Sequence, residues 1–253
     1  MDTIESASIL GVRVDNVDYA QTFQWVGRQI KQGYALQLST INPEFVMLAR
    51  KSPLFARILA ESALNVPDGA GILWAGRRLG IRFKERVTGS DLLPSLCSLA
   101  QQNLWRVFFL GAAQGIAEKC AAILSERYVG LRVAGTFSGS PAQESDDEIV
   151  PVIRNARPNI IFVAYGAPGQ NMWLARNLPK FTSGHADSGV VGIGVGGAFD
   201  FIAGVQTRAP TWIRSMSLEW LFRLVRQPSR WRRQREVFRF AWYVLIKSHQ
   251  LAT

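Results

Sequence analysis

The feature that most constrains the fold is an alternation of short apolar runs with amphipathic stretches along most of the chain. Runs such as RVFFLGA (106–112) and NIIFVAYG (159–166) are typical of buried strands, and a helical pattern follows each of them. Repeated strand–helix units of this kind predict an α/β fold, with a mostly parallel sheet and helices on both faces. Ligands of such sheets bind beyond the carboxyl ends of the strands, so the residues just after each strand are the candidates for a site.

The predicted elements follow the order of the chain. Ser52 is expected to cap a helix that has Pro53 at its first position, and Pro43 is expected to begin another. Strands are predicted at 9–16, 35–40, 63–67, 106–112, 131–137, 159–166 and 189–196, and helices at 19–32, 43–50, 52–61, 90–102, 115–128, 146–156 and 168–177, with a further helix starting in 68–80.

The last 46 residues carry almost all of the net charge of the protein. Residues 208–253 hold ten Lys+Arg and two acids, whereas residues 1–207 hold nineteen bases and seventeen acids. We therefore predict a body at 1–207 and a basic helical appendage at 208–253. Tryptophan with arginine is typical of a helix lying in an anionic membrane interface. Nucleic-acid binding and plain packing on the body are the alternatives. The apolar run 238–246 is too short to span a bilayer, which takes about 20 residues.

The remaining totals describe a folded globular protein. The chain has 253 residues, of which 48% are hydrophobic and 19% charged, enough for one large core or two modest ones. Cys97 and Cys120 lie in predicted helices without metal-ligand spacing, so we expect reduced core residues. The first residues, MDTIESASIL, do not fit a signal peptide. We expect a cytosolic protein, peripheral on the inner face of the membrane through the appendage.

Polar side chains follow the first two strands of the predicted sheet. Thr40 and Asn42 precede a helix, so Asn42 fits an N-cap, but both could also bind a sugar hydroxyl or a phosphate. Asp68 in VPDGAG fits a turn or a cap. An aspartate at the carboxyl end of a strand is equally suited to take a proton from an attacking hydroxyl.

Further candidates come from an arginine and two glycine turns. Arg86 in KERVTGSDL could pair with a surface acid or bind a phosphate or carboxylate. Gly111, Gly196 and Gly197 could let the backbone approach a diphosphate, although a tight connection explains them too. No Walker lysine follows, and the spacing disfavours a dinucleotide site. Neither His185 nor His249 has a metal-ligand pattern nearby, so we expect no metal and no cofactor.

Taken in order, these stretches resemble the WecG/TagA/CpsF family of bacterial glycosyltransferases (glycosyltransferase family 26). The resemblance lies in the whole string rather than in any single motif, and it covers nearly the whole chain. The segments that carry it are TINPEF, VPDGAGI, ERVTGSDL, FFLGAAQG, YGAPGQNMW, GVGGAFDFIAG and RAPTWIRSMSLEWLFRLVRQPSR.

The resemblance implies a Rossmann-like body and an inverting transfer without metal. A hexose or N-acetylhexosamine would move from a UDP-sugar to a sugar already linked to polyprenyl diphosphate, in the synthesis of a bacterial surface polysaccharide. N-acetylmannosamine, its uronic acid and glucose are donors within the family. The resemblance also implies a monomer–oligomer equilibrium.

The resemblance assigns roles to individual residues. Asp68 would be the general base, Thr40 and Asn42 would line the sugar site, and Arg86 and Gln170 would line the same cleft. Asp200 would contact the nucleotide. In the appendage, the residues that would grip the diphosphate of the acceptor are Arg223, Arg230 and Arg233.

The chain departs from the family pattern on both sides of Gln170. The family usually has a lysine before this glutamine and a glutamate after it, where this chain has Gly169 and Asn171. The nucleic-acid-binding protein remains the alternative from a different class. The cluster of glycine turns and acids at strand ends counts against it.

Overall fold

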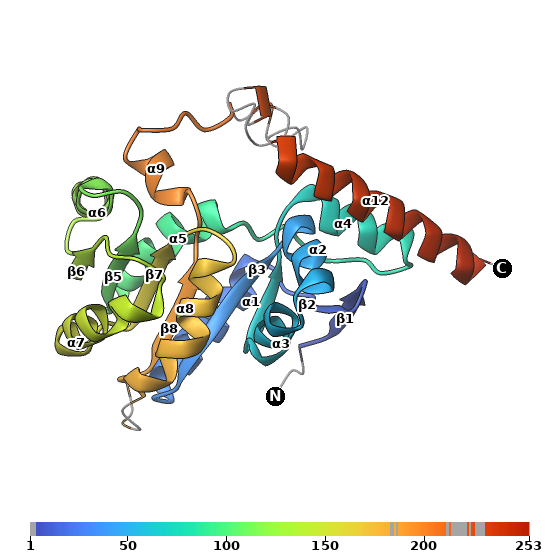
Figure 1. The fold of residues 1–253 in the computed structure, drawn as a ribbon. Helices are drawn as coiled ribbons and strands as arrows, with labels where there is room; N and C mark the ends of the chain where they lie inside the picture. The colour runs from blue at the N-terminus through green and yellow to red at the C-terminus, as the bar shows by residue number, and fades with distance from the viewer. Residues whose placement is uncertain are drawn as a thin grey trace.

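The computed structural model describes residues 4–182, 185, 187–210, 213, 222, 224–225 and 231–252, the side chains of 232–234 and 248–252 excepted. Its centre is a sheet of six parallel strands in the order β4-β3-β8-β7-β5-β6 (Figure 1). The strands span Ala35–Ile41 (β3), Leu64–Pro67 (β4), Arg106–Gly111 (β5), Arg132–Phe137 (β6), Ile160–Ala164 (β7) and Val190–Gly194 (β8). The predicted α/β, Rossmann-like parallel sheet is confirmed.

Helices cover both faces of this sheet, as predicted. Successive residues of a strand point to opposite faces. Phe109 therefore joins one core cluster and Phe108 the other. The first face is covered by α1 (Tyr19–Lys31), α5 (Gly89–Gln102), α6 (Ile116–Arg127) and α9 (Ala198–Ile202). The second face is covered by α7 (Asp146–Ala156), α8 (Gly169–Asn177) and the short turn η2 (Leu178–Phe181), with η1 (Gln143–Ser145) preceding α7.

Local signals in the sequence set several helix starts. The Asn42 side chain accepts a hydrogen bond from the Phe45 N–H at 3.0 Å and caps α2 (Pro43–Lys51). Ser52 caps α3 (Pro53–Glu61) in the same way. Each of these helices has proline at its first position, where the missing N–H leaves no bond unmade.

The first predicted strand is instead a hairpin. Residues 9–16 were expected to form one strand, but β1 (Ser6–Ile9) pairs antiparallel with β2 (Val12–Asp15). Leu10 and Gly11 form the turn, both with positive φ, at 50° and 93°. Two consecutive positive φ values are typical of a two-residue hairpin turn that matches strand twist. The sequence pattern failed because a leucine occupies a position that usually holds asparagine or glycine.

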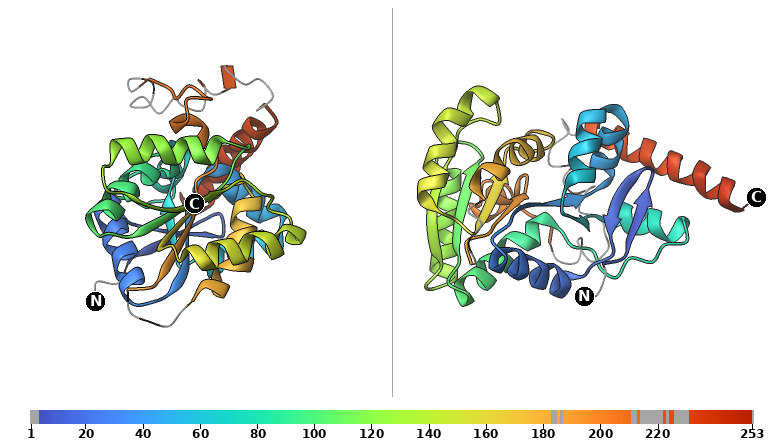
Figure 2. Two further views of the ribbon diagram at one scale, coloured as in Figure 1. Left: turned by 90° about the vertical axis from the view of Figure 1, so that its left-hand side faces the viewer. Right: turned by 90° about the horizontal axis from the view of Figure 1, so that it is seen from below.

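The hairpin belongs to a separate lobe beside the sheet. A third core cluster joins β1 and β2 to α2, α3, α4 (Ala70–Arg78) and α12 (Trp231–Ala252). Phe240 and Val244 of α12 are 1% and 0% exposed within it. In Figure 1 and in the right-hand view of Figure 2, α12 packs on this lobe, on the opposite side of the molecule from α6 and α7. The predicted boundary at residue 208 stays a prediction.

Two further expectations concern cysteines and membrane spans. Cys97 and Cys120 are buried and free, as predicted, and burial raises the pKa of the Cys120 thiol to about 12. Among the described residues, no helix combines the length and the apolar character needed to cross a bilayer.

Candidate functional site

The predicted strand-end residues share one edge of the sheet. Because β3, β4, β5, β7 and β8 are parallel, their carboxyl ends meet at that edge, with Asp68 after β4 and Gly111 at the end of β5. Four strand steps of about 4.8 Å separate β4 from β5, so this edge runs for about 19 Å between them. A single sugar cannot reach both ends, but an extended ligand such as a nucleotide sugar can.

Asp68 faces the start of α5 and does not cap the helix that follows it. The N-cap of α4 is Gly69, with φ of 88°, and Asp68 Oδ2 accepts a hydrogen bond from the Gly89 N–H at 3.4 Å. Gly89 is the first residue of α5, so the partial positive charge of that helix end acts on the carboxylate. The capping alternative for Asp68 is therefore wrong, and the carboxylate lies at the sheet edge.

Thr40 lies against the same helix start. A Cβ built on Gly89 would be 3.6 Å from Thr40 Oγ1 and 3.8 Å from the carbonyl oxygen of Gly194. Thr40 is 5% exposed, so it forms the floor between β3 and α5. Asn42 sits two residues on, with its side-chain oxygen committed to the cap of α2. Thr40, Asn42 and Asp68 thus come together at adjoining strand ends.

Gln170 supports the glycine turn after β8 from below. It is 3% exposed, and its Oε1 accepts a hydrogen bond from the Gly196 N–H at 2.9 Å. A Cβ on Gly194 would lie 2.5 Å from Gln170 Nε2, so only glycine admits the amide there. The Gly196 N–H, predicted to face a diphosphate, is thereby occupied within the protein. The geometry makes Gln170 a positioning residue for this turn.

The other predicted glycines and Asp200 lie toward β5. A Cβ on Gly111 would be 2.9 Å from the Tyr165 ring, so this glycine, with φ of 98°, seats the tyrosine at the end of β7. A Cβ on Gly197 would be 3.6 Å from Asp200 Oδ2. Burial raises the pKa of Asp200, and this carboxylate in turn acts on Cys120 of α6. Asp200, a residue of α9, therefore lies on the side of this helix that faces α6, toward the β5 end of the edge.

Arg86, and an ion pair that the sequence did not predict, lie near the Asp68 end of the sheet edge. Arg86 is half-buried in the loop before α5 and forms no ion pair within the ranges that the structure describes, so the expected pairing with a surface acid is not observed. Thr88 caps α5 through a hydrogen bond that its side chain accepts from the Asp91 N–H. Asp91 Oδ1 instead lies 2.7 Å from Arg208 Nη1. Sequence reasoning missed this pair, because the two residues are far apart in the chain.

A tyrosine joins the same group of side chains. The Tyr19 hydroxyl accepts a hydrogen bond from the Thr88 N–H at 3.0 Å. Burial, chiefly, raises the pKa of Tyr19, and the nearby carboxylates of Asp91 and Asp68 raise it further. The Asp68 end of the edge is thus a compact acidic and hydroxyl-bearing cluster. Tyr19 was not singled out from the sequence, because it reaches this cluster only through the packing of α1 against the loop before α5.

The predicted acceptor-binding arginines cannot be placed against this cluster. Arg223 and Arg230 lie outside the described residues, and Arg233 lies in α12 with its side chain outside them. Asn171, at the family's glutamate position, is 1% exposed and donates to Ser39 Oγ at 3.2 Å. Its substitution thus falls in the interior between α8 and β3. No group of three or more potential metal ligands occurs within the described part of the chain.

Comparisons with known proteins agree with one another. Residues 7–252 match the family model described as "Glycosyl transferase WecG/TagA/CpsF family". A Bacillus subtilis (strain 168) protein named N-acetylglucosaminyldiphosphoundecaprenol N-acetyl-beta-D-mannosaminyltransferase is 30% identical over 216 residues, 85% of this chain and 81% of its own. A Staphylococcus aureus (strain NCTC 8325) protein of the same name is 30% identical over 221 residues, 85% of this chain and 82% of its own. The chain belongs to the WecG/TagA/CpsF family of glycosyltransferases.

Proposed function

We propose that this member of the WecG/TagA/CpsF family transfers a hexose or N-acetylhexosamine from a UDP-sugar to a sugar carried on polyprenyl diphosphate. The observation that carries the proposal is the convergence of Asp68, Thr40 and the glycine turns on one sheet edge, in a chain that matches the family from residue 7 to residue 252. The names of the relatives, which act on an undecaprenyl-diphosphate sugar, support the acceptor class.

The proposed reaction is a single inverting displacement. Asp68 takes the proton of the acceptor hydroxyl, whose oxygen forms a bond to the anomeric carbon on the face opposite the departing UDP. The bond between that carbon and the β-phosphate oxygen breaks, and UDP leaves with the electron pair. Thr40 and Asn42 bind the sugar, whereas Arg86 holds charge on the diphosphate.

The nucleotide extends along the edge toward β5 in this proposal. The N-terminus of α6, which starts after Gly115 with φ of 81°, has no side-chain cap among the described residues, so the N–H groups of its first turn beyond Ile116 can face a phosphate. Asp200 of α9, on the side toward α6, contacts the nucleotide at that end. The residues present supply cationic and dipolar charge, so the proposed transfer requires no metal and no cofactor.

The acceptor is proposed to reach the site through the membrane-lying face of α12. Large apolar side chains lie on one stripe of this helix, namely Trp231, Phe238, Trp242 and Leu245, which are 42–65% exposed. Their spacing of seven, four and three residues fits one helix face, opposite the buried Phe240 and Val244. Such a stripe, interleaved with the exposed Arg235 and Arg239, suits a peripheral contact with an anionic leaflet.

The basic appendage also contacts elements at the Asp68 end of the sheet edge. Arg208 is ion-paired to Asp91 in the first turn of α5, and α12 returns to pack on α2 and α4. These two helices begin directly after Asn42 and Gly69. Arg223, Arg230 and Arg233 of this appendage are proposed to bind the diphosphate of the acceptor.

The test is a transfer assay with several UDP-sugars and a short-chain polyprenyl diphosphate carrying N-acetylglucosamine, read by mass spectrometry of the lipid. We expect one added sugar from at least one donor, and unchanged activity in EDTA. Folded protein that extends the acceptor with none of the donors would contradict the proposal. A tight, salt-sensitive gel shift with RNA or DNA would favour the nucleic-acid alternative instead.

A further inference from the structure

A second basic segment lies outside the C-terminal appendage, at the end of α4 and in the loop that follows. Residues 77–86 contain five bases, namely Arg77, Arg78, Arg82, Lys84 and Arg86, and one acid, Glu85. The proposed transfer uses Arg86 alone. Arginines in the last turn of a helix suit its dipole, but Arg82 and Lys84 lie beyond the helix, so the dipole does not account for them.

The backbone of this segment is folded back tightly on α4. Gly80, with φ of 74°, donates to the Arg77 carbonyl at 3.4 Å, and the Ile81 N–H donates to the Gly76 carbonyl at 2.8 Å. These two bonds form a Schellman motif, which ends the helix and reverses the chain. A Cβ on Gly76 would be 2.8 Å from the Phe83 ring, so glycine is needed for the loop to lie against the helix. The fold therefore brings Arg77 of the helix and Arg82 of the loop to the same hollow.

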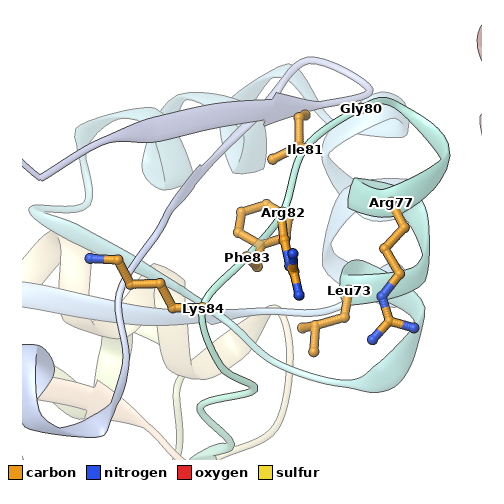
Figure 3. Close-up of a pocket in the computed structure, with 7 residues that line it drawn as sticks. All are labelled: Leu73, Arg77, Gly80, Ile81, Arg82, Phe83 and Lys84. Atoms are coloured by element: carbon orange, nitrogen blue, oxygen red, sulfur yellow. The ribbon is translucent and has the colours of Figure 1, made fainter.

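The helix and the returning loop enclose a surface hollow of about 620 Å³ (Figure 3). Its lining is amphipathic, with the apolar side chains of Leu73, Ile81 and Phe83 beside three cations, Arg77, Arg82 and Lys84. Figure 3 shows Leu73 between the guanidinium groups of Arg77 and Arg82, while Lys84 points away from them. Lys84 Nζ donates to Gln21 Oε1 at 3.0 Å, which turns it toward α1.

No carboxylate of the described residues neutralises the charge of these two arginines. Neither Arg77 nor Arg82 forms an ion pair within the parts of the chain that the structure describes, unlike Arg176 and Arg208. Two uncompensated guanidinium groups beside an apolar floor match a ligand that has a phosphate at one end and hydrocarbon at the other. Guanidinium groups bind phosphate oxygens in pairs, which gives such a ligand a defined position.

We propose that this hollow binds the phosphodiester head group of an anionic phospholipid, with the glycerol and the first methylenes over Leu73 and Ile81. The hollow is open on the surface, so a small soluble anion would gain only the charge contacts. A lipid would also cover the apolar floor. Continuity with α12 supports this choice, since α12 packs on α4 itself (Figure 1). The inference depends on one part of the proposed function, namely that α12 lies on a lipid surface.

The test compares five proteins whose thermal unfolding is first shown to match: the wild type, R77Q, R82Q, the R77Q/R82Q double variant and R78Q. Arg78 is the matched control, because it is exposed in the same helix turn but does not line the hollow. Binding is measured by flotation with vesicles of phosphatidylcholine containing 30% phosphatidylglycerol, at 0.15 M salt. Each lining substitution should weaken binding by about fivefold and the double variant by about thirtyfold, since one basic residue at an anionic leaflet contributes ~1 kcal/mol.

If R78Q lost as much vesicle binding as R77Q and R82Q, the attraction would be a diffuse effect of surface charge, and the proposal would be overturned. Calorimetric titration with monomeric dihexanoyl-phosphatidylglycerol and with inorganic phosphate separates lipid from free anion. We expect the short lipid to bind the wild type and R78Q but not the R77Q/R82Q double variant. Equal affinity for phosphate and short lipid, or no binding of the short lipid, would refute a lipid site. Head-group binding in a protein that transfers no sugar would reject only the proposed reaction.

Discussion

The sheet and the lobe beside it are held together in different ways. The sheet is apolar on both faces, with Phe108 and Phe109 entering two separate cores, and each covering helix belongs to a neighbouring strand–helix unit. The lobe instead joins the first strands to the last helix across the length of the chain. Its contacts with α12 include charged groups at the surface, with Lys51 Nζ 2.7 Å from Glu236 Oε1 and Arg50 lying 4.3 Å from the Tyr243 ring centre.

In the proposed function, this difference separates two tasks in space. Donor binding would need a rigid edge, which the sheet provides through local strand–helix units. Contact with a lipid would need an outward face, and the lobe buries one side of α12 while Trp242, 65% exposed, stays on the other. Substitutions in the two regions should therefore change different measured quantities.

The largest expected effect is on the chemical step. Asp68→Asn keeps the shape of the side chain but removes the base, so we expect transfer to fall by about 10³-fold, within the range for lost acid–base catalysis. Single-turnover assays and thermal unfolding would check this. Glu85→Gln, in the exposed loop between α4 and α5, is the control and should retain activity. Near-normal turnover in Asp68→Asn would reject the assigned base.

The next effect is on the stability of the sheet region. Asp146, in the first turn of α7, is 5% exposed and accepts a hydrogen bond from Arg176 Nη2 at 2.9 Å. Arg176→Met leaves this carboxylate buried without its cation, which should reduce the free energy of unfolding by about 3 kcal/mol at pH 7. Urea unfolding would measure it, with the exposed Arg154→Met as control. A loss below 1 kcal/mol would contradict the buried pair.

The same pair predicts a pH dependence. Burial acts to raise the pKa of Asp146, but hydrogen bonds from Arg176 and Asn177 outweigh it and lower the pKa below its ordinary value. A lowered pKa contributes stability above the unfolded value of about 3.9, and that contribution is lost as the pH falls through the folded pKa. The difference in free energy of unfolding between wild type and Arg176→Met should therefore become smaller below about pH 4. A difference that becomes larger in acid would refute this.

A substitution in the core of the lobe is expected to have a local effect, limited to the attachment of one helix. Phe240→Ala removes a buried ring and should weaken the attachment of α12 by roughly 3 kcal/mol, although the sheet can stay folded. Hydrogen exchange should then speed up in α12 but not in β5 or β7. Phe238→Ala, at a position 56% exposed, is the matched control. Equal acceleration in the strands would show that sheet and lobe unfold as one unit.

The smallest effect is expected at the surface contact of α12. A hydrogen bond from Lys51 lowers the pKa of Glu236, but the two side chains are 49% and 23% exposed. Glu236→Gln should therefore reduce the free energy of unfolding by less than 1 kcal/mol. Urea unfolding in low and high salt would measure this. A loss as large as that in Phe240→Ala would show that charge rather than apolar burial attaches the helix.

Much of the fold was predictable because its signals are local. The caps at Asn42 and Ser52 and the apolar runs of β5 and β7 mark their elements within a few residues. The hairpin at Leu10 was missed because its turn lacks the usual residues, and the burial of Asp146 because its partner Arg176 lies 30 residues away. Patterns along the chain report periodicity, whereas an ion pair between two helices depends on their packing.

The site was predictable to the same extent. Strand ends pointed to Thr40 and Asp68, which the structure brings to one edge. Sequence reasoning could not show that Gln170 lies beneath the glycine turn, because a buried amide and an exposed one look alike in sequence. The ion pair between Asp91 and Arg208 was not predicted because, as with Asp146 and Arg176, the two residues are far apart in the chain. The roles of the individual residues stay predictions.

Hydrogen exchange with two separate ligands tests most directly whether donor and lipid use different regions. UDP should slow exchange in the strand-end segments 111–116 and 194–200 and leave α12 unchanged. Vesicles containing phosphatidylglycerol should slow exchange in α12 and leave both of those segments unchanged. If UDP instead protects α12 alone, or if both ligands protect the same segments, the separation of donor binding from membrane contact is wrong.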